Sequence, residues 1–169
     1  MKQIAETDRL IIREFVEDDL LSLYKIESNS TIIEYMPWNK LSTLSDCRRK
    51  LKAYISDYKK YKLNTWAIVL KETNDVIGIT QLVYTKKVKG VELGTKILPE
   101  YWSKGYASEL SKAIIEYGLN ELKIDEIIAA TDINNAGAIK SLLKIGMTFK
   151  KYGYYNGAES AFFSAKRMS

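Results

Sequence analysis

One stretch of the sequence joins a strand-like segment, a short loop with a lysine and a glycine, and the start of a helix. The segment 91–97 ends before Pro99, the loop follows at 102–105, and helical spacing begins directly after it. The first amides of a helix have no acceptor inside the helix, and that end carries partial positive charge. Gly105 lets the backbone come close to a ligand without a Cβ, and Lys104 adds charge. The stretch therefore suits the binding of phosphate groups.

The residue types that the chain lacks also restrict its chemistry. There is no histidine and only one cysteine, Cys47. Ser–His and Cys–His nucleophilic pairs are therefore excluded, as are the common zinc sites, and we expect no metal. Proton transfer near neutral pH has to use carboxylates, tyrosines, lysines or water. Cys47 falls on an apolar helical stripe, so we expect it to be a buried packing residue.

The length of the chain favours one globular domain, and its net charge does not identify a binding partner. The chain has 169 residues, 46% of them hydrophobic, and a formal net charge of +5. The charge permits an anionic partner, but a solvated lysine-rich surface is the preferred explanation for most of it. The N-terminus has no apolar run typical of a secretory signal, and no segment has the roughly 20 apolar residues of a membrane span. We expect a cytoplasmic protein without a membrane partner.

The elements that must position the phosphate-binding stretch form one α/β domain with a mixed sheet. No linker, repeat or low-complexity tract divides the chain. Gly78 interrupts one strand and indicates a bulge, and Asn156–Gly157 indicates a hairpin turn. Apolar spacing predicts strands at 9–15, 65–70, 76–83, 91–97 and 125–130 and in the final hairpin, and helices after Asp18, at about 44–58, from 107 and after Asn135.

Four stretches together resemble the GNAT superfamily of acyl-CoA-dependent N-acetyltransferases. The pyrophosphate loop of that family is [RQ]-x-x-G-x-[GA], and residues 102–107 read Trp-Ser-Lys-Gly-Tyr-Ala. Tryptophan in the first place is similar to the ribosomal-protein alanine/serine N-terminal acetyltransferase branch, in which Ser103 would usually be glycine. Residues 7–13, 92–94 and 135–147 resemble further segments of the same branch.

The resemblance implies a fold and a cosubstrate. The fold is a single domain over residues 1–169, with a mixed, mostly antiparallel sheet of about seven strands and helices on both faces. The fourth strand carries a bulge and parts from the fifth, and a main-chain N–H near Ile97 or Leu98 polarises the thioester of acetyl-CoA. Lys104 is equally consistent with a solvated lysine, and Asn135 with a helix cap. The implied cofactor-binding residues are Ile97, Leu98, Trp102, Ser103, Lys104, Gly105, Tyr106, Ala107, Ser108 and Asn135.

The implied reaction is direct attack of a neutral amine on the thioester in a ternary complex. Glu92 is the candidate for the base that takes the proton from the amine, directly or through water. The alternative interpretation is that Glu92 is a solvent-facing strand residue without a catalytic role. Many family members place a tyrosine acid in the last helix, where this sequence has Leu142. Ser141 is the candidate substitute, with Tyr152, Tyr154 and Tyr155 as alternatives.

The acceptor is the part that the sequence defines least. The branch implies a protein N-terminal amine, and a polyamine or aminoglycoside is the alternative, which an acidic cleft would favour. Met36, Trp38 and Tyr155 are candidate acceptor-binding residues, equally consistent with core packing. A nucleic-acid-binding module and a non-catalytic coenzyme A-binding protein lie outside this class; the first lacks a recognisable reader motif. Pairing of two chains is frequent in such folds, so a homodimer is also considered.

Overall fold

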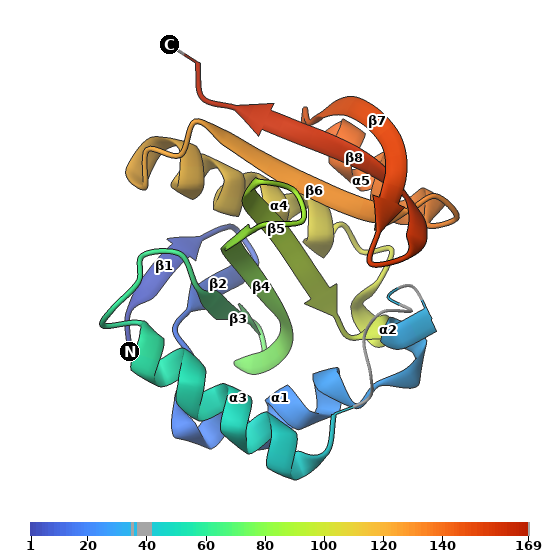
Figure 1. The fold of residues 1–169 in the computed structure, drawn as a ribbon. Helices are drawn as coiled ribbons and strands as arrows, with labels where there is room; N and C mark the ends of the chain where they lie inside the picture. The colour runs from blue at the N-terminus through green and yellow to red at the C-terminus, as the bar shows by residue number, and fades with distance from the viewer. Residues whose placement is uncertain (35, 37–41, 169) are drawn as a thin grey trace.

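The computed structural model describes residues 1–34, 36 and 42–168. One eight-stranded sheet runs through it in the order β1-β2-β3-β4-β5-β6-β8-β7 (Figure 1). Its strands are β1 (Gln3–Glu6), β2 (Leu10–Arg13), β3 (Thr65–Leu70), β4 (Asp75–Thr85), β5 (Gly90–Ile97), β6 (Glu126–Asp132), β7 (Thr148–Tyr155) and β8 (Ala158–Lys166). All neighbouring pairs are antiparallel except β5 and β6.

Helices cover both faces of the sheet, as predicted. The α-helices are α1 (Leu20–Glu27), α2 (Ser30–Glu34), α3 (Leu44–Asp57), α4 (Tyr106–Glu116) and α5 (Ala136–Lys144). The short helices are η1 (Glu17–Asp19), η2 (Pro99–Tyr101) and the π-helical turn η3 (Tyr117–Glu121). The side chain of Thr43 caps α3 by accepting from the amide of Asp46.

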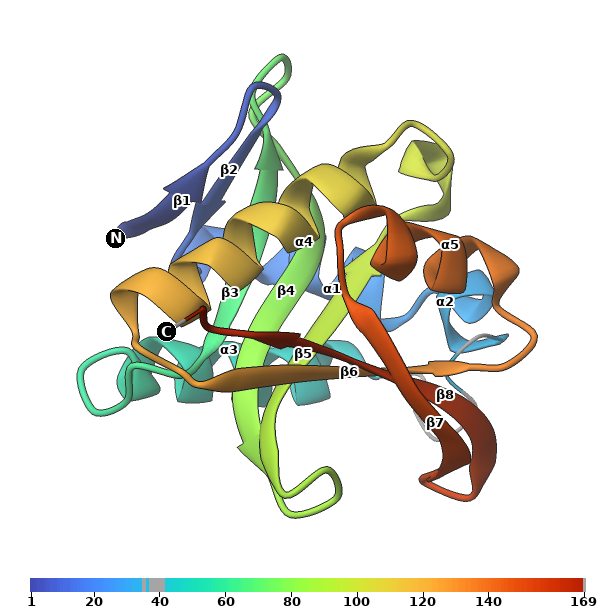
Figure 2. The ribbon, with the colours of Figure 1, turned by 90° about the horizontal axis from the view of Figure 1, so that it is seen from above.

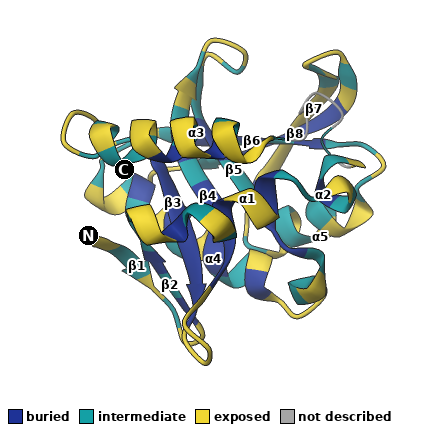
Figure 3. Ribbon diagram, turned by 90° about the horizontal axis from the view of Figure 1, so that it is seen from below, coloured by how far each residue is buried: buried dark blue, intermediate teal, exposed yellow. Residues whose placement is uncertain are grey.

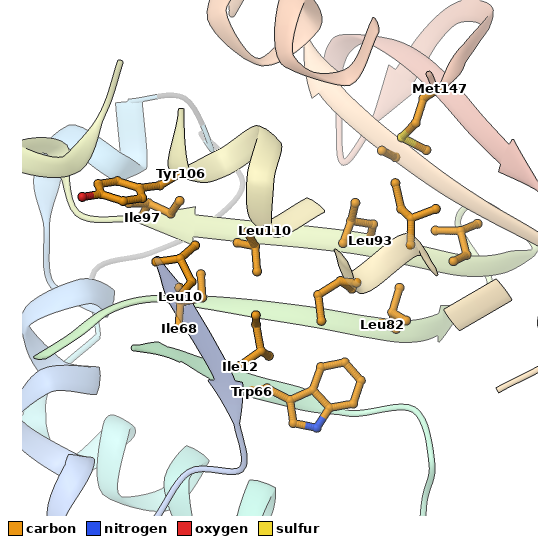
Figure 4. Packing of buried hydrophobic residues seen from close by; sticks show 14 of the residues in the cluster. Leu10, Ile12, Trp66, Ile68, Leu82, Leu93, Ile97, Tyr106, Leu110 and Met147 are labelled. Atoms are coloured by element: carbon orange, nitrogen blue, oxygen red, sulfur yellow. The ribbon is translucent and has the colours of Figure 1, made fainter. Parts of the chain in front are cut away.

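Two apolar clusters hold these layers together. In the first, Leu110 and Ile114 of α4 pack on strand residues that include Leu10 and Ile97 (Figure 4). In the second, residues of α1 and α3 cover the opposite face of the sheet, and Cys47 is fully buried there. Figure 3 shows these two helices exposed on their outer sides over the buried strands β3 and β4. All six residues of β3 are buried, as expected for a strand with helices on both sides.

The sheet has one strand more than the predicted seven. The additional strand is β1, which pairs with β2 through Gln3↔Arg13, Ala5↔Ile12 and Glu6↔Ile11. It contains only four residues, none of them fully buried. Because so short a segment carries little apolar alternation, the sequence pattern does not reveal it.

The predicted separation of two strands is present between β5 and β6. Their parallel pairing is limited to Val91↔Ile127 and Glu92↔Ile128. β6 pairs instead with β8 along its whole length, while β5 continues along β4 to Ile97. Figure 2 shows the two strands diverging. The side of β5 that faces away from β4 is therefore open beyond Glu92.

The position of the bulge differs from the family expectation. β5 pairs with β4 without a register shift from Gly78↔Ile97 to Thr85↔Gly90. The prediction of a bulge on β5 is therefore wrong. The shift lies between β3 and β4, where Ile68 pairs with Gly78 and Val69 with Val76. The bulge indicated by Gly78 is thus confirmed. A Cβ at Gly78 would lie 2.4 Å from the carbonyl oxygen of Lys96 and 2.9 Å from Cδ1 of Ile68.

We predict that Gly78→Ala lowers the free energy of unfolding by about 1–3 kcal/mol, because the sheet has to move to admit one methyl group. Urea unfolding measures the effect. The control is Gly137→Ala in α5, where the nearest atom to a new Cβ is 3.7 Å away and a gain of about 0.5–1 kcal/mol is expected. Equal unfolding midpoints for the two variants would contradict the proposed close contact.

Candidate active site

A cavity of about 790 Å³ lies at the opening between β5 and β6. β5 contributes Glu92 to Ile97, the loop before α4 and its first turn contribute Trp102 to Ser103 and Gly105 to Ser108, and the start of α5 contributes Asn134 to Ala138. The opposite wall comes from α1, α2, α3 and the β7–β8 hairpin. Its lining residues include Glu27, Ile32, Met36, Lys50, Tyr54, Tyr155 and Asn156. The cavity therefore runs from one face of the sheet to the other through the opening.

The loop before α4 presents uncapped amides to this cavity. Gly105 is the N-cap residue of α4, with φ = 84°, and has no side chain to satisfy the first-turn N–H groups. Those amides belong to Tyr106, Ala107 and Ser108, which line the cavity. Ser103 is also left-handed, with φ = 59°. Two left-handed residues around a helix N-terminus direct N–H groups toward one point, a geometry that binds anions.

Trp102 occupies the first position of the loop motif, and its indole has a structural role there. Its Nε1–H donates to the carbonyl oxygen of Ile97 over 2.6 Å. That carbonyl belongs to the part of β5 that has no β6 partner. The indole therefore satisfies an open strand edge and fixes the loop to the end of β5.

Arg9 holds the same loop from the other side. Its NH1 donates to the carbonyl oxygen of Lys104 over 2.9 Å, and its Nε donates to Glu109 over 2.7 Å. The guanidinium lies 4.3 Å from the centre of the Tyr106 ring. Burial alone would raise the pKa of Glu109, but hydrogen bonds from Thr7 and Arg9 lower it. The resemblance of residues 7–13 pointed to this strand, but the role of Arg9 was missed because its partners lie about 100 residues away.

Two predicted cofactor contacts are not supported by the geometry. The N–H of Leu98 donates to the carbonyl oxygen of Ile77 over 2.9 Å, so it is not available to polarise a thioester. Because N–H groups alternate sides along a strand, the N–H of Ile97 faces the open edge instead. The ammonium group of Lys104 lies 5.5 Å from the centre of the Tyr101 ring, and Lys104 does not line the cavity. A phosphate contact by Lys104 stays a prediction.

Glu92 is buried, with 7% of its surface exposed, and lies at the point where β5 and β6 part. Its Oε2 accepts a hydrogen bond from the Tyr155 hydroxyl at 2.9 Å and a longer one from Thr85 at 3.3 Å. Burial raises the pKa of Glu92, and these hydrogen bonds offset only part of that effect. Burial and the neighbouring carboxylate raise the pKa of Tyr155. Glu92 is thus suited to accept a proton, and Tyr155 to remain protonated.

The start of α5 supplies the other predicted polar residues. The side-chain oxygen of Asn135 accepts from the amide of Ala138 at 3.0 Å, so Asn135, rather than Asn134, caps α5. Asn135 also lines the cavity, and its side-chain NH2 group is left for a ligand contact. The hydroxyl of Ser141 lies 3.3 Å from that of Ser108 at the same wall. Met36 lines the acceptor side, whereas Trp38 lies outside the described residues.

One charged cluster in the cavity was missed by sequence reasoning. Lys50 and Lys96 both form ion pairs with Glu27, and all three side chains line the cavity. They come from α3, β5 and α1. No sequence spacing links them, so only the packing of α1 and α3 on the sheet reveals the cluster.

The described part of the chain contains neither a metal-site cluster nor a membrane-spanning helix. Within residues 1–34, 36 and 42–168, no three His, Cys, Asp or Glu side chains converge as a metal site would need. Each helix in these ranges is too short or too polar to cross a bilayer.

Comparison with known proteins agrees with the observed fold. Residues 9–148 match the family model described as acetyltransferase (GNAT) domain. An uncharacterised N-acetyltransferase of Bacillus subtilis, YnaD, is 32% identical over 151 residues, covering 88% of this chain and 84% of that protein. A GNAT-family acetyltransferase from Bacillus anthracis has a TM-score of 0.82 at 25% identity, covering 96% of this chain and 98% of that one.

A third similar structure was solved in complex with coenzyme A, which is what remains of acetyl-CoA after acetyl transfer. The ribosomal L7/L12 α-N-protein acetyltransferase RimL, in complex with coenzyme A, has a TM-score of 0.82 over 98% of both chains. At 12% identity this likeness shows a shared fold alone. The family match and the relatives together establish that this chain belongs to the GNAT family of N-acetyltransferases, and that it is an acetyltransferase.

We predict that Arg9→Ala weakens coenzyme A binding roughly tenfold, because hydrogen bonds from a charged donor are worth about 1.5–3 kcal/mol and here hold the loop in shape. Isothermal titration calorimetry with coenzyme A measures the affinity. The control is Arg49→Ala, which removes an exposed ion pair with Asp46 on α3. Equal affinities of the two variants would show that Arg9 does not shape the loop.

We predict that Glu92→Gln lowers kcat/KM and removes the part of its pH dependence that comes from Glu92. In the parent, kcat/KM falls as pH decreases through the raised pKa of Glu92, because the protonated carboxyl cannot take a proton. The acceptor amine, with a pKa of about 8 for an α-amine, gives a second limb that both proteins share. Glu72→Gln, at an exposed turn, is the control. Identical profiles for parent and Glu92→Gln would exclude Glu92 from the reaction.

We also predict that Glu92→Gln changes the thermal stability of the protein. A carboxyl whose pKa is raised by folding opposes folding when it is ionised, and this cost disappears at pH values below its ordinary pKa of 4.5. Glu92→Gln is therefore expected to raise the melting temperature at pH 7–8, with a difference that narrows toward pH 4. A lower melting temperature at neutral pH would mean that the ionised carboxylate stabilises the fold.

Proposed function

We propose that the protein transfers an acetyl group from acetyl-CoA to the N-terminal amine of a protein or peptide, by direct attack in a ternary complex. One observation carries the proposal. One continuous cavity joins uncapped helix amides on one side of the β5–β6 opening to a buried carboxylate, Glu92, on the other side. A cosubstrate whose diphosphate lies at these amides would therefore present its thioester to an amine nucleophile at the open edge of β5.

The residues around the loop fit the cosubstrate. Gly105 leaves the α4 amides without a side-chain cap, and the amides of Tyr106, Ala107 and Ser108 would hold the pyrophosphate. The open edge of β5 would pair with the pantetheine amides as an additional strand. Asn135 and the Ser108–Ser141 hydroxyl pair lie on the wall that this arm would follow. Trp102 and Ser103 complete the loop.

In the proposed reaction, the amine nitrogen forms a bond to the thioester carbonyl carbon and the carbon–sulfur bond breaks. Glu92 takes the proton from the amine, directly or through a water molecule, and Tyr155 holds the carboxylate in position. The N–H of Ile97 faces the open edge and would stabilise negative charge on the carbonyl oxygen. The thiolate leaves without a strong acid, since a thiol has a pKa of about 8.5. The Ser141 hydroxyl is the proposed hydrogen-bond donor to it.

The charges in the cavity bear on the choice of acceptor. The described lining residues include three lysines, Lys50, Lys87 and Lys96, and two glutamates, Glu27 and Glu92. A polyamine carries several positive charges, and its binding would require an excess of carboxylates. The observed balance favours an acceptor with few positive charges, such as a peptide N-terminus.

The test is release of free thiol from acetyl-CoA with a panel of N-terminal peptides, spermidine and an aminoglycoside, followed by mass spectrometry to locate the acetyl group. We expect thiol release with peptides and acetylation of their α-amine. Turnover confined to spermidine or the aminoglycoside would reject the proposed acceptor, and no turnover with any amine would reject catalysis of this reaction.

A further inference from the structure

The ion cluster at the acceptor end of the cavity consists of Glu27, Lys50 and Lys96. The side chain of Glu27 is 5% exposed, while those of Lys96 and Lys50 are 20% and 39% exposed. Lys96 Nζ lies 2.5 Å from Oε1 of Glu27, and Lys50 Nζ contacts Oε2. Lys50 also donates to the Ser42 hydroxyl at 3.0 Å. The carboxylate is thus enclosed, and the two ammonium groups reach toward the cavity.

One lysine would be enough to neutralise Glu27. Burial alone would raise the pKa of Glu27, but Lys96 and Lys50 together lower it, so the carboxylate is ionised at neutral pH. The cluster therefore carries one excess positive charge at the wall of a partly buried cavity. Each ammonium has three N–H donors, and the contacts above use one of those of Lys96 and two of those of Lys50. The remaining donors and the excess charge suit an anion.

The cluster faces the same side of β5 as Glu92. Side chains at every second strand position share a face, so Glu92 lies on the face of β5 from which Lys96 reaches Glu27 of α1. The residue between them on this face is Gly94, which places no side chain in the way. Four strand residues span about 13 Å. An acceptor amine at Glu92 and an anion at Lys96 would therefore be separated by roughly that distance or somewhat less.

We propose that Lys50 and Lys96, held by Glu27, bind the carboxylate of an acidic residue within the first four residues of the acceptor peptide. This inference rests on the proposed function. An extended chain advances about 3.3–3.6 Å per residue, so an acidic side chain at the second to fourth position reaches from Glu92 to the cluster. The amine and carboxylate of a free α-amino acid are too close together to do so. The acceptor is thus an acidic peptide N-terminus.

The experiment compares two C-terminally amidated peptides, Ala-Ala-Glu-Ala and Ala-Ala-Gln-Ala, as acceptors for acetyl-CoA. Amidation removes the terminal carboxylate, so the glutamate is the sole anion. We expect kcat/KM to be on the order of tenfold higher for the acidic peptide, mainly through KM, because charge-assisted hydrogen bonds are stronger than those between neutral groups. Calorimetric binding of both peptides to the protein with coenzyme A gives a readout that does not depend on turnover.

Variants locate the effect. Lys50→Met and Lys96→Met are expected to reduce the preference for the acidic peptide to threefold or less, and Lys50→Arg is expected to retain it. Lys52→Met removes an exposed lysine from the same helix and is expected to change nothing. Thermal melting of each variant shows whether it is folded. Lys50→Arg keeps the positive charge, so it still tests the site if a methionine variant does not fold.

The outcomes separate this inference from the proposed function. Absence of thiol release with every amine rejects the function, and calorimetry then still decides whether acidic peptides bind preferentially. Equal kcat/KM and equal affinity for the two peptides overturn the carboxylate site. A preference that survives both methionine substitutions but is lost in Lys87→Met would also overturn it, since Lys87 lies at the other end, 5.4 Å from the Tyr155 ring centre.

Discussion

The active site depends on the early end of pairing between β5 and β6. Only Val91 and Glu92 pair with β6, so the rest of β5 has main-chain groups on one edge without a strand partner. Backbone polar groups in a protein interior have to be satisfied, and a strand edge readily pairs with another chain. Trp102 satisfies the carbonyl of Ile97, and the proposed pantetheine arm would pair with the remaining groups. The opening is therefore a structural cost, and it is the place where the proposed linear cosubstrate would be held beside the sheet.

β5 also separates the two substrates, because its side chains alternate between the faces of the sheet. Leu93 and Ile97 pack in the cluster under α4, on the side of the phosphate-binding loop. Glu92 and Lys96 point to the opposite face, where α1, α3 and the β7–β8 hairpin form the acceptor wall. Glu92 is buried, and the donors to its carboxylate among the described residues are the hydroxyls of Tyr155 and Thr85, which leaves the ionised form unfavourable. Such a cost is typical of a functional carboxylate whose pKa is adjusted for proton transfer.

Apolar periodicity predicted the mixed α/β class and Gly78 predicted the bulge, whereas the helices on both faces and the split sheet were implied by the resemblance to the GNAT family. The loop from Trp102 to Ser108 was also predictable, since strand, glycine and helix follow one another in the chain. β1 was missed because four residues show too little alternation. The bond from the N–H of Leu98 to Ile77 was not predicted, because the partner of an N–H depends on strand register. Arg9 and the Glu27 cluster were missed because each joins elements distant in the sequence.

The central claim is that one continuous cleft holds the pyrophosphate at the N-terminus of α4 and the thioester at the open edge of β5. The most direct measurement is a crystal structure of the protein with coenzyme A. The account predicts phosphate oxygens within hydrogen-bonding distance of the amides of Tyr106 to Ser108, and the thiol on the β5 edge near Ile97. Coenzyme A bound away from this loop, or β5 and β6 closed over its pantetheine arm, would contradict it.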